Sequence, residues 1–440
     1  MSEQIDHPLK RMVTMQKKGM SAGICSICSA HPIVLEAAIE KGLEDNSYVL
    51  IEATANQVNQ YGGYTGLTPL TFAVQVKAIA ARLGFPEERL ILGGDHFGPL
   101  VWKNLSEEHA MARAKELVSD CVLAGFSKVH IDTSMRLTGD DPDMPLACER
   151  IAARAAVLFE TAQRAWETAG LSMPPVYVIG SEVPVPGGTS CTEDLEVTSA
   201  GELERTYTCF REAFMKVYPQ AFSQVVAIVA QPGVEFGEGY IHDYAPDSAR
   251  ALCDCAKRLP LVLEGHSTDY QTRESLKELV RGGVAILKVG PALTFALREG
   301  LLLLEHIEKE LPPRRMTSSL SQFSAVLDRV MCEKPEFWRS YYRGSEDEER
   351  FLRKFSLSDR CRYYLPDHAV EDAARRLLQN LNHAGIPLEL ISQYFPIQYE
   401  KIRTNTLEPN AMSLLKDRVK TCLDAYPKFT WKENTVYITT

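Results

Sequence analysis

The chain has 440 residues, of which 45% are hydrophobic and 24% are charged, so it can bury a large core and exceeds the usual length of one domain. Its formal net charge of −10 argues against a general nucleic-acid or anionic-membrane surface, because such a chain would not neutralise phosphate groups wholesale. The N-terminal segment has no apolar signal core, and no stretch approaches the roughly 18 apolar residues that span a bilayer. We therefore expect a cytoplasmic protein with one large domain and an appendage.

Short β-rich runs alternate with longer segments of helical period from residue 20 to about residue 310. The expected strands are residues 22–28, 48–52, 90–94, 128–132, 176–182, 225–230, 261–264 and 285–289. The expected helices between them include residues 68–83, 106–124, 147–169, 200–217 and 270–280. This alternation is typical of βα units around a parallel sheet, and eight strands close a (β/α)8 barrel. The predicted fold class is therefore α/β, with a TIM barrel as its architecture.

After Pro312 and Pro313 the β-branched runs fade, and helical-period segments such as 369–381 and 411–423 dominate. We predict a class II aldolase-like barrel over residues 1–312 and a mostly helical C-terminal extension over residues 313–440 that packs on the barrel. The extension is rich in aromatic side chains, for which we favour packing on the barrel wall over a partner surface. Its segment from Ser356 to Tyr364 mixes hydroxyl, charged and aromatic groups and could also reach the barrel mouth.

Eleven cysteines are scattered along the chain, which does not match the disulfide framework of a small secreted domain. Cys25 and Cys28 have the spacing of a redox or metal pair. Their only close counterpart, Cys253-Asp254-Cys255, lacks the second CxxC of a zinc ribbon. We therefore interpret the pair as reduced, buried thiols around the first strand.

Charged and amide side chains gather where the expected strands end. Asp95 and His96 follow the apolar run 90–92, and other runs end in Glu52, Asp132, Glu182, Gln231, Glu264 and Lys288. In a TIM barrel the carboxyl ends of the strands meet at one face and carry the catalytic groups. An acid beside a histidine at this face suits a general acid or a metal ligand. Two alternatives stay open, in which Asp95 only caps a Gly-rich turn and in which His96 and His266 are structural histidines.

Several long phrases carry a resemblance to a known family. They are residues 23–32, 51–66, Gly94-Asp95-His96, Glu182-Val183-Pro184-Val185-Pro186-Gly187-Gly188, 231–236, 265–272 and 288–299. On these residues the chain resembles the family of tagatose-bisphosphate aldolase non-catalytic subunits, from about residue 10 to Tyr394. Members of this family have been described as accessory subunits of a class II tagatose-1,6-bisphosphate aldolase, as tagatose-6-phosphate kinases and as 4-epimerases of tagatose 6-phosphate.

The resemblance therefore leaves three candidate functions. The kinase description fits worst, because the chain has no GxxxxGK[ST] loop to hold ATP. We expect a metal-assisted 4-epimerase of ketohexose phosphates, which converts tagatose 6-phosphate to fructose 6-phosphate in tagatose or galactitol catabolism. The alternative is a non-catalytic subunit that stabilises and activates a class II aldolase, which would then be its partner. Self-association into a homo-oligomer stays open, and neither nucleic acid nor a membrane is expected.

The metal site is predicted from a more distant resemblance to class II aldolases. Their Asp-His pair matches Asp95 and His96, but Gln231 and Glu264 stand where the other two ligand histidines would fall. We still expect a divalent metal ion such as zinc, held by His96, Glu182, Glu264 and His266. The catalytic acids and bases that we expect are Asp95, Asp132 and Glu182.

The remaining candidates would bind the substrate. They are Glu52, Asn59, Gln231, Ser267, Thr268, Lys288, Gly290 and Arg298. The phosphate seat of such barrels usually lies in the loops after the seventh and eighth strands, where Ser267, Thr268 and Gly290 fall. Lys288 could form a Schiff base, but we favour a cation that neutralises substrate charge. We expect His130 to be a packing residue at a strand end.

Overall fold

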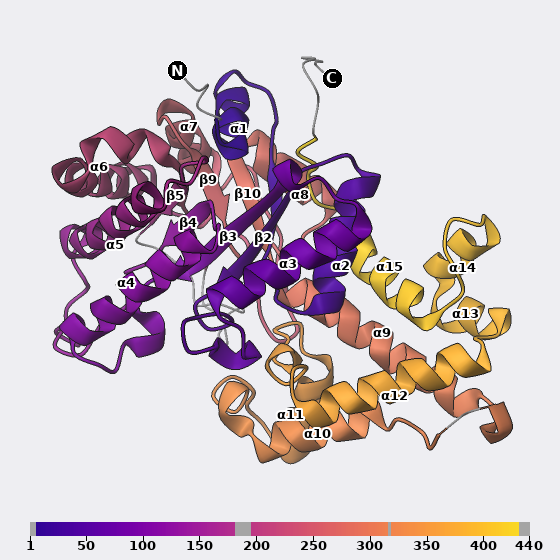
Figure 1. Ribbon diagram of the computed structural model, residues 1–440. Coiled ribbons are helices and arrows are strands. Elements are labelled where there is room, and N and C mark those ends of the chain that lie inside the picture. The colour runs from indigo at the N-terminus through magenta and orange to yellow at the C-terminus, as the bar shows by residue number, and fades with distance from the viewer. Residues whose placement is uncertain (1–5, 181–194, 316–317, 431–440) are drawn as a thin grey trace.

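The computed structural model describes residues 6–180, 195–315 and 318–430. Eight parallel strands close into a barrel in the order β1-β10-β9-β6-β5-β4-β3-β2 (Figure 1). These strands are β1 (Ile24–Ile27), β2 (Val49–Thr54), β3 (Leu90–Phe97), β4 (Lys128–Ile131), β5 (Val176–Ile179), β6 (Val225–Val229), β9 (Val262–Gly265) and β10 (Val284–Val289). A short antiparallel hairpin, β7 (Glu235–Phe236) with β8 (Ile241–His242), follows β6. The predicted TIM barrel is thus confirmed.

Helices follow the strands and cover the outside of the barrel. They are α2 (Pro32–Glu44), α3 (Pro69–Leu83), α4 (Glu107–Leu123), α5 (Cys148–Ala169), α6 (Ala200–Val217), α7 (Arg250–Arg258), α8 (Arg273–Arg281) and α9 (Pro291–Glu310). The sequence sets several of their starts. Thr68 accepts a hydrogen bond from the Thr71 amide ahead of Pro69 at the first position of α3, and Ser106 caps α4.

The barrel interior has an apolar layer at the N-terminal end of the strands. Helix α1 (Pro8–Lys17) lies across this end and buries Leu9, Met12 and Val13 (Figure 1). These side chains share a cluster with strand residues Ile24, Leu50, Ile91, Val176, Val178 and Val226. Because this end is closed by apolar packing, polar side chains inside the barrel can meet solvent only at the opposite end.

The helices after the barrel form the expected extension. They are α10 (Phe323–Glu333), α11 (Glu346–Phe355), α12 (His368–Ala384), α13 (Leu388–Tyr394), α14 (Pro396–Arg403) and α15 (Ala411–Leu423). Trp338, Tyr342 and Tyr364 are buried, and their polar atoms donate to backbone carbonyls of the extension itself, so these aromatic residues pack inside the extension. Helix α15 returns to lie along α2 and α9, where Lys416 Nζ is 2.8 Å from Glu36 Oε1 (Figure 1).

Both ends of the described chain lie beside the closed end of the barrel. Phe429 stacks on Tyr48, the residue directly before β2, with ring centroids 5.2 Å apart. At the other terminus, His7 Nε2 lies 3.2 Å from Ser127 Oγ, directly before β4. Among the helices described, none is both long and apolar enough to cross a membrane.

Candidate active site at the barrel mouth

Strand alternation brings the charged residues of β4 and β9 into the barrel. Successive side chains of a strand point to opposite faces, so Lys128, His130 and Asp132 share the inner face, while Val129 packs outward among the helix contacts. The same spacing relates Glu264 to His266 at the end of β9. All of these polar side chains are buried.

In strand β3 two consecutive residues both face the barrel interior, which a regular strand does not allow. Asp95 and His96 are consecutive, yet both are 4% exposed and lie in the same polar cluster. His96 adopts a left-handed backbone conformation with φ of 51°, and the register with β4 shifts between Gly94 and Phe97. This irregularity breaks the alternation, and such strain in a non-glycine residue is typical of functional sites.

A network of buried ion pairs forms the floor of the site. Lys128 Nζ lies 2.7 Å from Glu52 Oε1 and 2.6 Å from Glu264 Oε2. Lys288 Nζ lies 2.9 Å from Glu52 Oε2 and 2.7 Å from Asp95 Oδ1. Burial disfavours the ammonium group of Lys288, but the surrounding carboxylates outweigh it and raise its pKa well above the usual value. Lys288 is therefore a fixed positive charge at neutral pH.

Three histidines lie above this floor, with ring centroids 4.9 to 5.2 Å apart. One ring nitrogen of each lies near a carboxylate oxygen, at 3.1 Å for His96 with Asp132, 3.0 Å for His130 with Asp95 and 3.2 Å for His266 with Glu264. Carboxylates that orient histidines in this way leave the second nitrogen for a metal ion. The His130 ring differs in one respect, because its Nδ1 also accepts a hydrogen bond from the His96 amide at 3.2 Å.

The donor set fits a metal ion. Ligand atoms of Asp95, His96, His130 and His266 all lie within 4.8 Å of one another. His130 Nε2 is buried and has no hydrogen-bond partner among the described residues. The surrounding charged groups are the carboxylates of Glu52, Asp95, Asp132 and Glu264 and the ammonium groups of Lys128 and Lys288. With neutral histidines, the formal charge of this cluster is therefore −2. A divalent cation bound by imidazole and carboxylate would balance this charge.

Burial and neighbouring charges shift the pKa values of His130, His96 and Asp95 in different directions. Burial lowers the pKa of His130 to about 4, despite its contact with Asp95. For His96 the carboxylates of Asp95 and Asp132 outweigh burial and raise the pKa. Burial also opposes the charge on Asp95, but Lys288 and His96 outweigh it and hold the pKa of this carboxyl well below its usual range. Such divergent values are common where acid–base or metal chemistry occurs.

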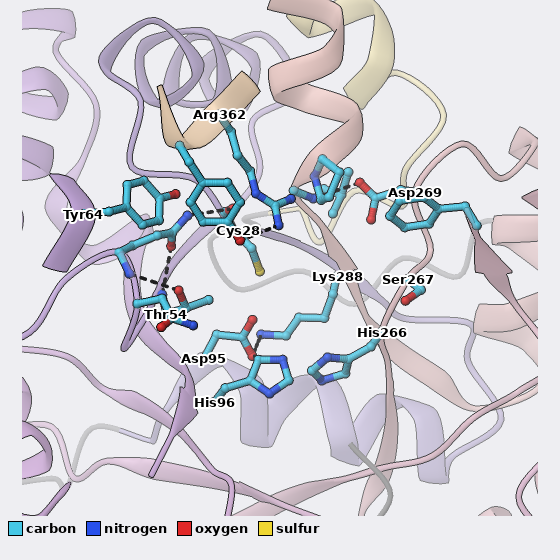
Figure 2. Close-up of a pocket in the computed structure, with 17 residues that line it drawn as sticks. Cys28, Thr54, Tyr64, Asp95, His96, His266, Ser267, Asp269, Lys288 and Arg362 are labelled. Atoms are coloured by element: carbon cyan, nitrogen blue, oxygen red, sulfur yellow. Dashed lines mark hydrogen bonds and ion pairs between the residues drawn. The ribbon is translucent and has the colours of Figure 1, made fainter. Parts of the chain in front are cut away.

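A pocket lined by charged, hydroxyl and aromatic side chains opens over the cluster (Figure 2). Figure 2 shows Lys288 and Asp95 pointing toward each other, with His96 and His266 side by side. Six of the predicted site residues line the pocket: Asp95, His96, His266, Ser267, Lys288 and Gly290. Glu52, Asp132 and Glu264 are buried behind them and hold them through the contacts given above.

The other predicted site residues lie elsewhere. Asn59 donates to the Ala55 carbonyl and Gln231 accepts from the Gly233 amide, so both stabilise local turns. Thr268 Oγ1 donates to the Lys288 carbonyl at 2.6 Å. The Arg298 guanidinium is buried inside the extension, where Nε lies 3.1 Å from Asp359 Oδ1. Glu182 lies outside the described residues.

The structure also brings in residues that the sequence did not single out. His130, which we expected to be a packing residue, joins the metal-ligand cluster, and its spacing from Lys128 and Asp132 could have indicated this. Arg362 and Tyr363 come from the extension and line the pocket, as the segment 356–364 allowed. Cys28 also lines the pocket, and both Cys25 and Cys28 are free and partly buried rather than fully buried thiols.

Comparisons with known proteins agree along nearly the whole chain. The sequence profile of the D-tagatose-1,6-bisphosphate aldolase subunit GatZ/KbaZ-like family matches residues 9–430. The chain is 46% identical over 427 residues to the D-tagatose-1,6-bisphosphate aldolase subunit GatZ of Salmonella agona (strain SL483), which covers 95% of this chain and 98% of that protein. The subunit GatZ of Salmonella heidelberg (strain SL476) is similar to the same extent. A crystal structure described as a probable tagatose 6 phosphate kinase from Sinorhizobium meliloti 1021 superposes with a TM-score of 0.83 at 43% identity, over 92% of this chain and 99% of that one.

Proposed function

Because this chain belongs to the GatZ/KbaZ-like family of D-tagatose-1,6-bisphosphate aldolase subunits, we propose that it is the non-catalytic subunit that stabilises and activates a class II tagatose-1,6-bisphosphate aldolase. The observation that carries this proposal is the similarity over nearly the full length to proteins named as subunits of that aldolase. Gln231 and Glu264 stand where two ligand histidines of class II aldolases would fall. Their presence agrees with the proposal, since a separate catalytic chain would then supply the complete aldolase metal site.

The subunit proposal is tested by pairing the chain with a catalytic class II tagatose-bisphosphate aldolase. The two proteins should elute together in size-exclusion chromatography, and the aldolase should keep its activity longer at a fixed temperature when this chain is present. An equal amount of albumin controls for general protection. Separate elution together with an unchanged rate of inactivation would contradict the proposal.

The site at the mouth favours a second candidate, a 4-epimerase of ketohexose phosphates. A chain that acted only as a scaffold would not need three carboxylate-oriented histidines and a buried lysine–carboxylate network beneath an open pocket. These groups cost free energy to bury, which structural packing alone does not require. Such a cost is common where the groups perform chemistry.

Epimerisation at C4 can proceed by retro-aldol cleavage. The C4 hydroxyl loses its proton as the C3–C4 bond breaks, which gives an aldehyde at C4 and an enediolate over C2 and C3. The aldehyde then rotates about the C4–C5 bond, the enediolate carbon attacks its other face, and the proton returns to the C4 oxygen. Two acid–base groups and a stabilised enediolate are therefore required.

The residues of the pocket can be given these roles. Asp95 lines the pocket as a carboxylate and would accept the proton of the C4 hydroxyl. Lys288, 2.7 Å from Asp95, places a fixed positive charge beside the developing negative charge. Asp132 would position His96, and Glu182 stays a candidate for the second acid–base group. A divalent ion such as zinc, held by His96, His130 and His266, would stabilise the charge on the enediolate oxygens.

The epimerase candidate is tested with the purified chain alone. Tagatose 6-phosphate and a divalent metal salt are added, and fructose 6-phosphate formation is followed by NMR. Conversion that disappears in Asp95→Asn, while the variant keeps its thermal melting profile, would support the mechanism. A folded, metal-loaded chain that leaves tagatose 6-phosphate unchanged would rule this candidate out and leave the subunit proposal standing.

A further inference from the structure

The usual phosphate seat of a TIM barrel is already filled in this protein. That seat is built from backbone amides in the last two strand–helix loops and at a helix N-terminus. Here Asp269 Oδ1 accepts hydrogen bonds from the amides of Gly290 at 3.0 Å and Ala292 at 2.8 Å, at the start of α9. Thr268 donates its hydroxyl to the Lys288 carbonyl in the same region. A carboxylate thus occupies donors that would otherwise meet a phosphate.

Lys288, at the pocket floor, is already paired with carboxylates. Lys288 Nζ already contacts the carboxylates of Asp95 and Glu52, and it is buried. A phosphate placed there would lie next to both carboxylates and would be repelled by them. The anion of a sugar phosphate therefore needs a different cation in the same pocket.

Arg362 is the cation that meets this requirement. It comes from the short 3-10 helix Cys361–Tyr363 of the extension, and Figure 2 shows its side chain reaching into the pocket from the side opposite Lys288 and Asp95. Among the described residues, its guanidinium donates to Tyr363 Oη at 3.1 Å and forms no ion pair. Its other donors are therefore available to an anion, and a guanidinium can bind phosphate with two parallel hydrogen bonds.

Aromatic packing fixes the position of this arginine. Tyr363 stacks on Phe337 with ring centroids 4.8 Å apart and an interplanar angle of 5°, and Tyr64 meets Tyr363 edge-on at 4.8 Å. The guanidinium of Arg362 lies 4.9 Å from the Tyr363 ring centroid. Arg360 is 2% exposed and its guanidinium lies over the Tyr341 ring, 3.3 Å from the centroid, so it places a second positive charge beside Tyr363.

We propose that Arg362 anchors the phosphate of a phosphorylated ligand, so that the C-terminal extension rather than the barrel loops supplies the phosphate seat of the pocket. The ligand's carbon chain then extends from Arg362 toward Asp95, Lys288 and the histidines. This inference rests on the second candidate function, in which the pocket binds a ketohexose phosphate. It also gives the extension a role in selecting phosphorylated over free sugars, beyond packing on the barrel.

The anchor is tested by binding, which needs no turnover. Isothermal titration of the full chain with fructose 6-phosphate, fructose and inorganic phosphate compares the native protein with Arg362→Gln and Arg362→Lys. We expect Arg362→Gln to bind fructose 6-phosphate about 10- to 100-fold more weakly, since it loses a charged bidentate contact. The affinity of Arg362→Lys for fructose 6-phosphate should lie between those of the native protein and Arg362→Gln, because lysine keeps the positive charge but cannot form two parallel hydrogen bonds. Affinity for fructose should stay unchanged in both.

Arg375→Gln is the matched control, because Arg375 lies on α12 of the extension, is 60% exposed and pairs with the nearby Asp372. It should bind like the native protein. Equal affinity of the native protein and Arg362→Gln for fructose 6-phosphate would overturn the anchor, and so would a native protein that binds fructose 6-phosphate no better than fructose. Binding that depends on Arg362 without epimerisation would uphold the anchor and remove only the epimerase candidate.

A measurement on the native chain guards against a variant that fails to fold. Phenylglyoxal modifies accessible arginines, and peptide mass spectrometry reports each site. Inorganic phosphate should protect Arg362 from modification and leave Arg375 unprotected. Modification of Arg362 at the same rate with and without phosphate would contradict the anchor.

Discussion

Asp132 Oδ2 lies 3.1 Å from His96 Nδ1, and this contact orients the imidazole so that Nε2 is the nitrogen on the side of Asp95. Asp132 is held in turn by Ser134, whose hydroxyl donates to Asp132 Oδ1 at 2.6 Å. Asp132 therefore acts on the pocket through His96 rather than by lining it. Residues in this position control ligand orientation and basicity at metal sites.

The first prediction follows from this contact. Asp132→Asn should lower the affinity for a divalent metal ion about 10- to 100-fold, because the amide weakens the orientation and basicity of His96. Competition with a chromophoric chelator measures the change. Asp417→Asn is the control, since Asp417 is equally buried but pairs with Lys401 in the extension. If both variants bound metal like the native protein, the positioning role of Asp132 would be wrong.

The second prediction concerns the chemistry of Lys288. Treatment with borohydride in the presence of tagatose 6-phosphate should leave Lys288 unmodified, as judged by peptide mass spectrometry. Its ammonium is held by Asp95 and Glu52, and its pKa is raised well above the usual value, so it lacks the free amine that attacks a carbonyl. A reduced adduct on Lys288 would show that a Schiff base forms after all.

The third prediction tests the buried ion-pair network. Lys128→Met should lower the free energy of unfolding by about 3–5 kcal/mol, because it leaves the buried Glu52 and Glu264 carboxylates with one cation fewer. Lys277→Met removes an exposed lysine from a surface pair and should change stability by no more than about 0.5 kcal/mol. Urea unfolding measures both. Similar small losses in the two variants would mean that the network contributes little to folding.

The fourth prediction is a pH dependence set at the closed end of the barrel. Burial, aided by Lys10, lowers the pKa of His7 from 6.5 to about 3. The unfolded chain then binds the proton first as the pH falls, so this stability is complete above pH 6.5 and is lost toward pH 3. His7→Asn keeps a helix-capping side chain at α1 without the titration, so its stability should fall less steeply between pH 7.5 and pH 5. Denaturant unfolding at each pH gives the two slopes, and parallel slopes would contradict the assignment to His7.

Local sequence was sufficient to predict the barrel. The β-branched runs define eight strands to within a few residues, and caps such as Thr68 and Ser106 mark helix starts within one residue. These features depend on period and on local hydrogen bonding, which a sequence shows directly. Polar strand ends likewise indicated that Asp95, His96, His266 and Lys288 share one mouth.

The rest of the site depends on contacts that sequence spacing does not show. The left-handed conformation of His96 arises within an irregular strand end, and no residue type there predicts it. Arg362 reaches the pocket from the extension, through a chain path that no periodicity specifies. Conversely, Arg298 lies close to the barrel in sequence, but Asp359 draws its guanidinium into the extension. Tertiary packing decided each of these positions.

The closed end of the barrel, where Phe429 packs on Tyr48 and His7 contacts Ser127, has a practical consequence for handling the protein. A tether attached beside His7 or Phe429 would hold the molecule by the face opposite its pocket. Immobilised on a sensor chip in this way, the protein would present its mouth to the flowing solution, so that binding of small sugars and of a class II aldolase could be compared on one surface.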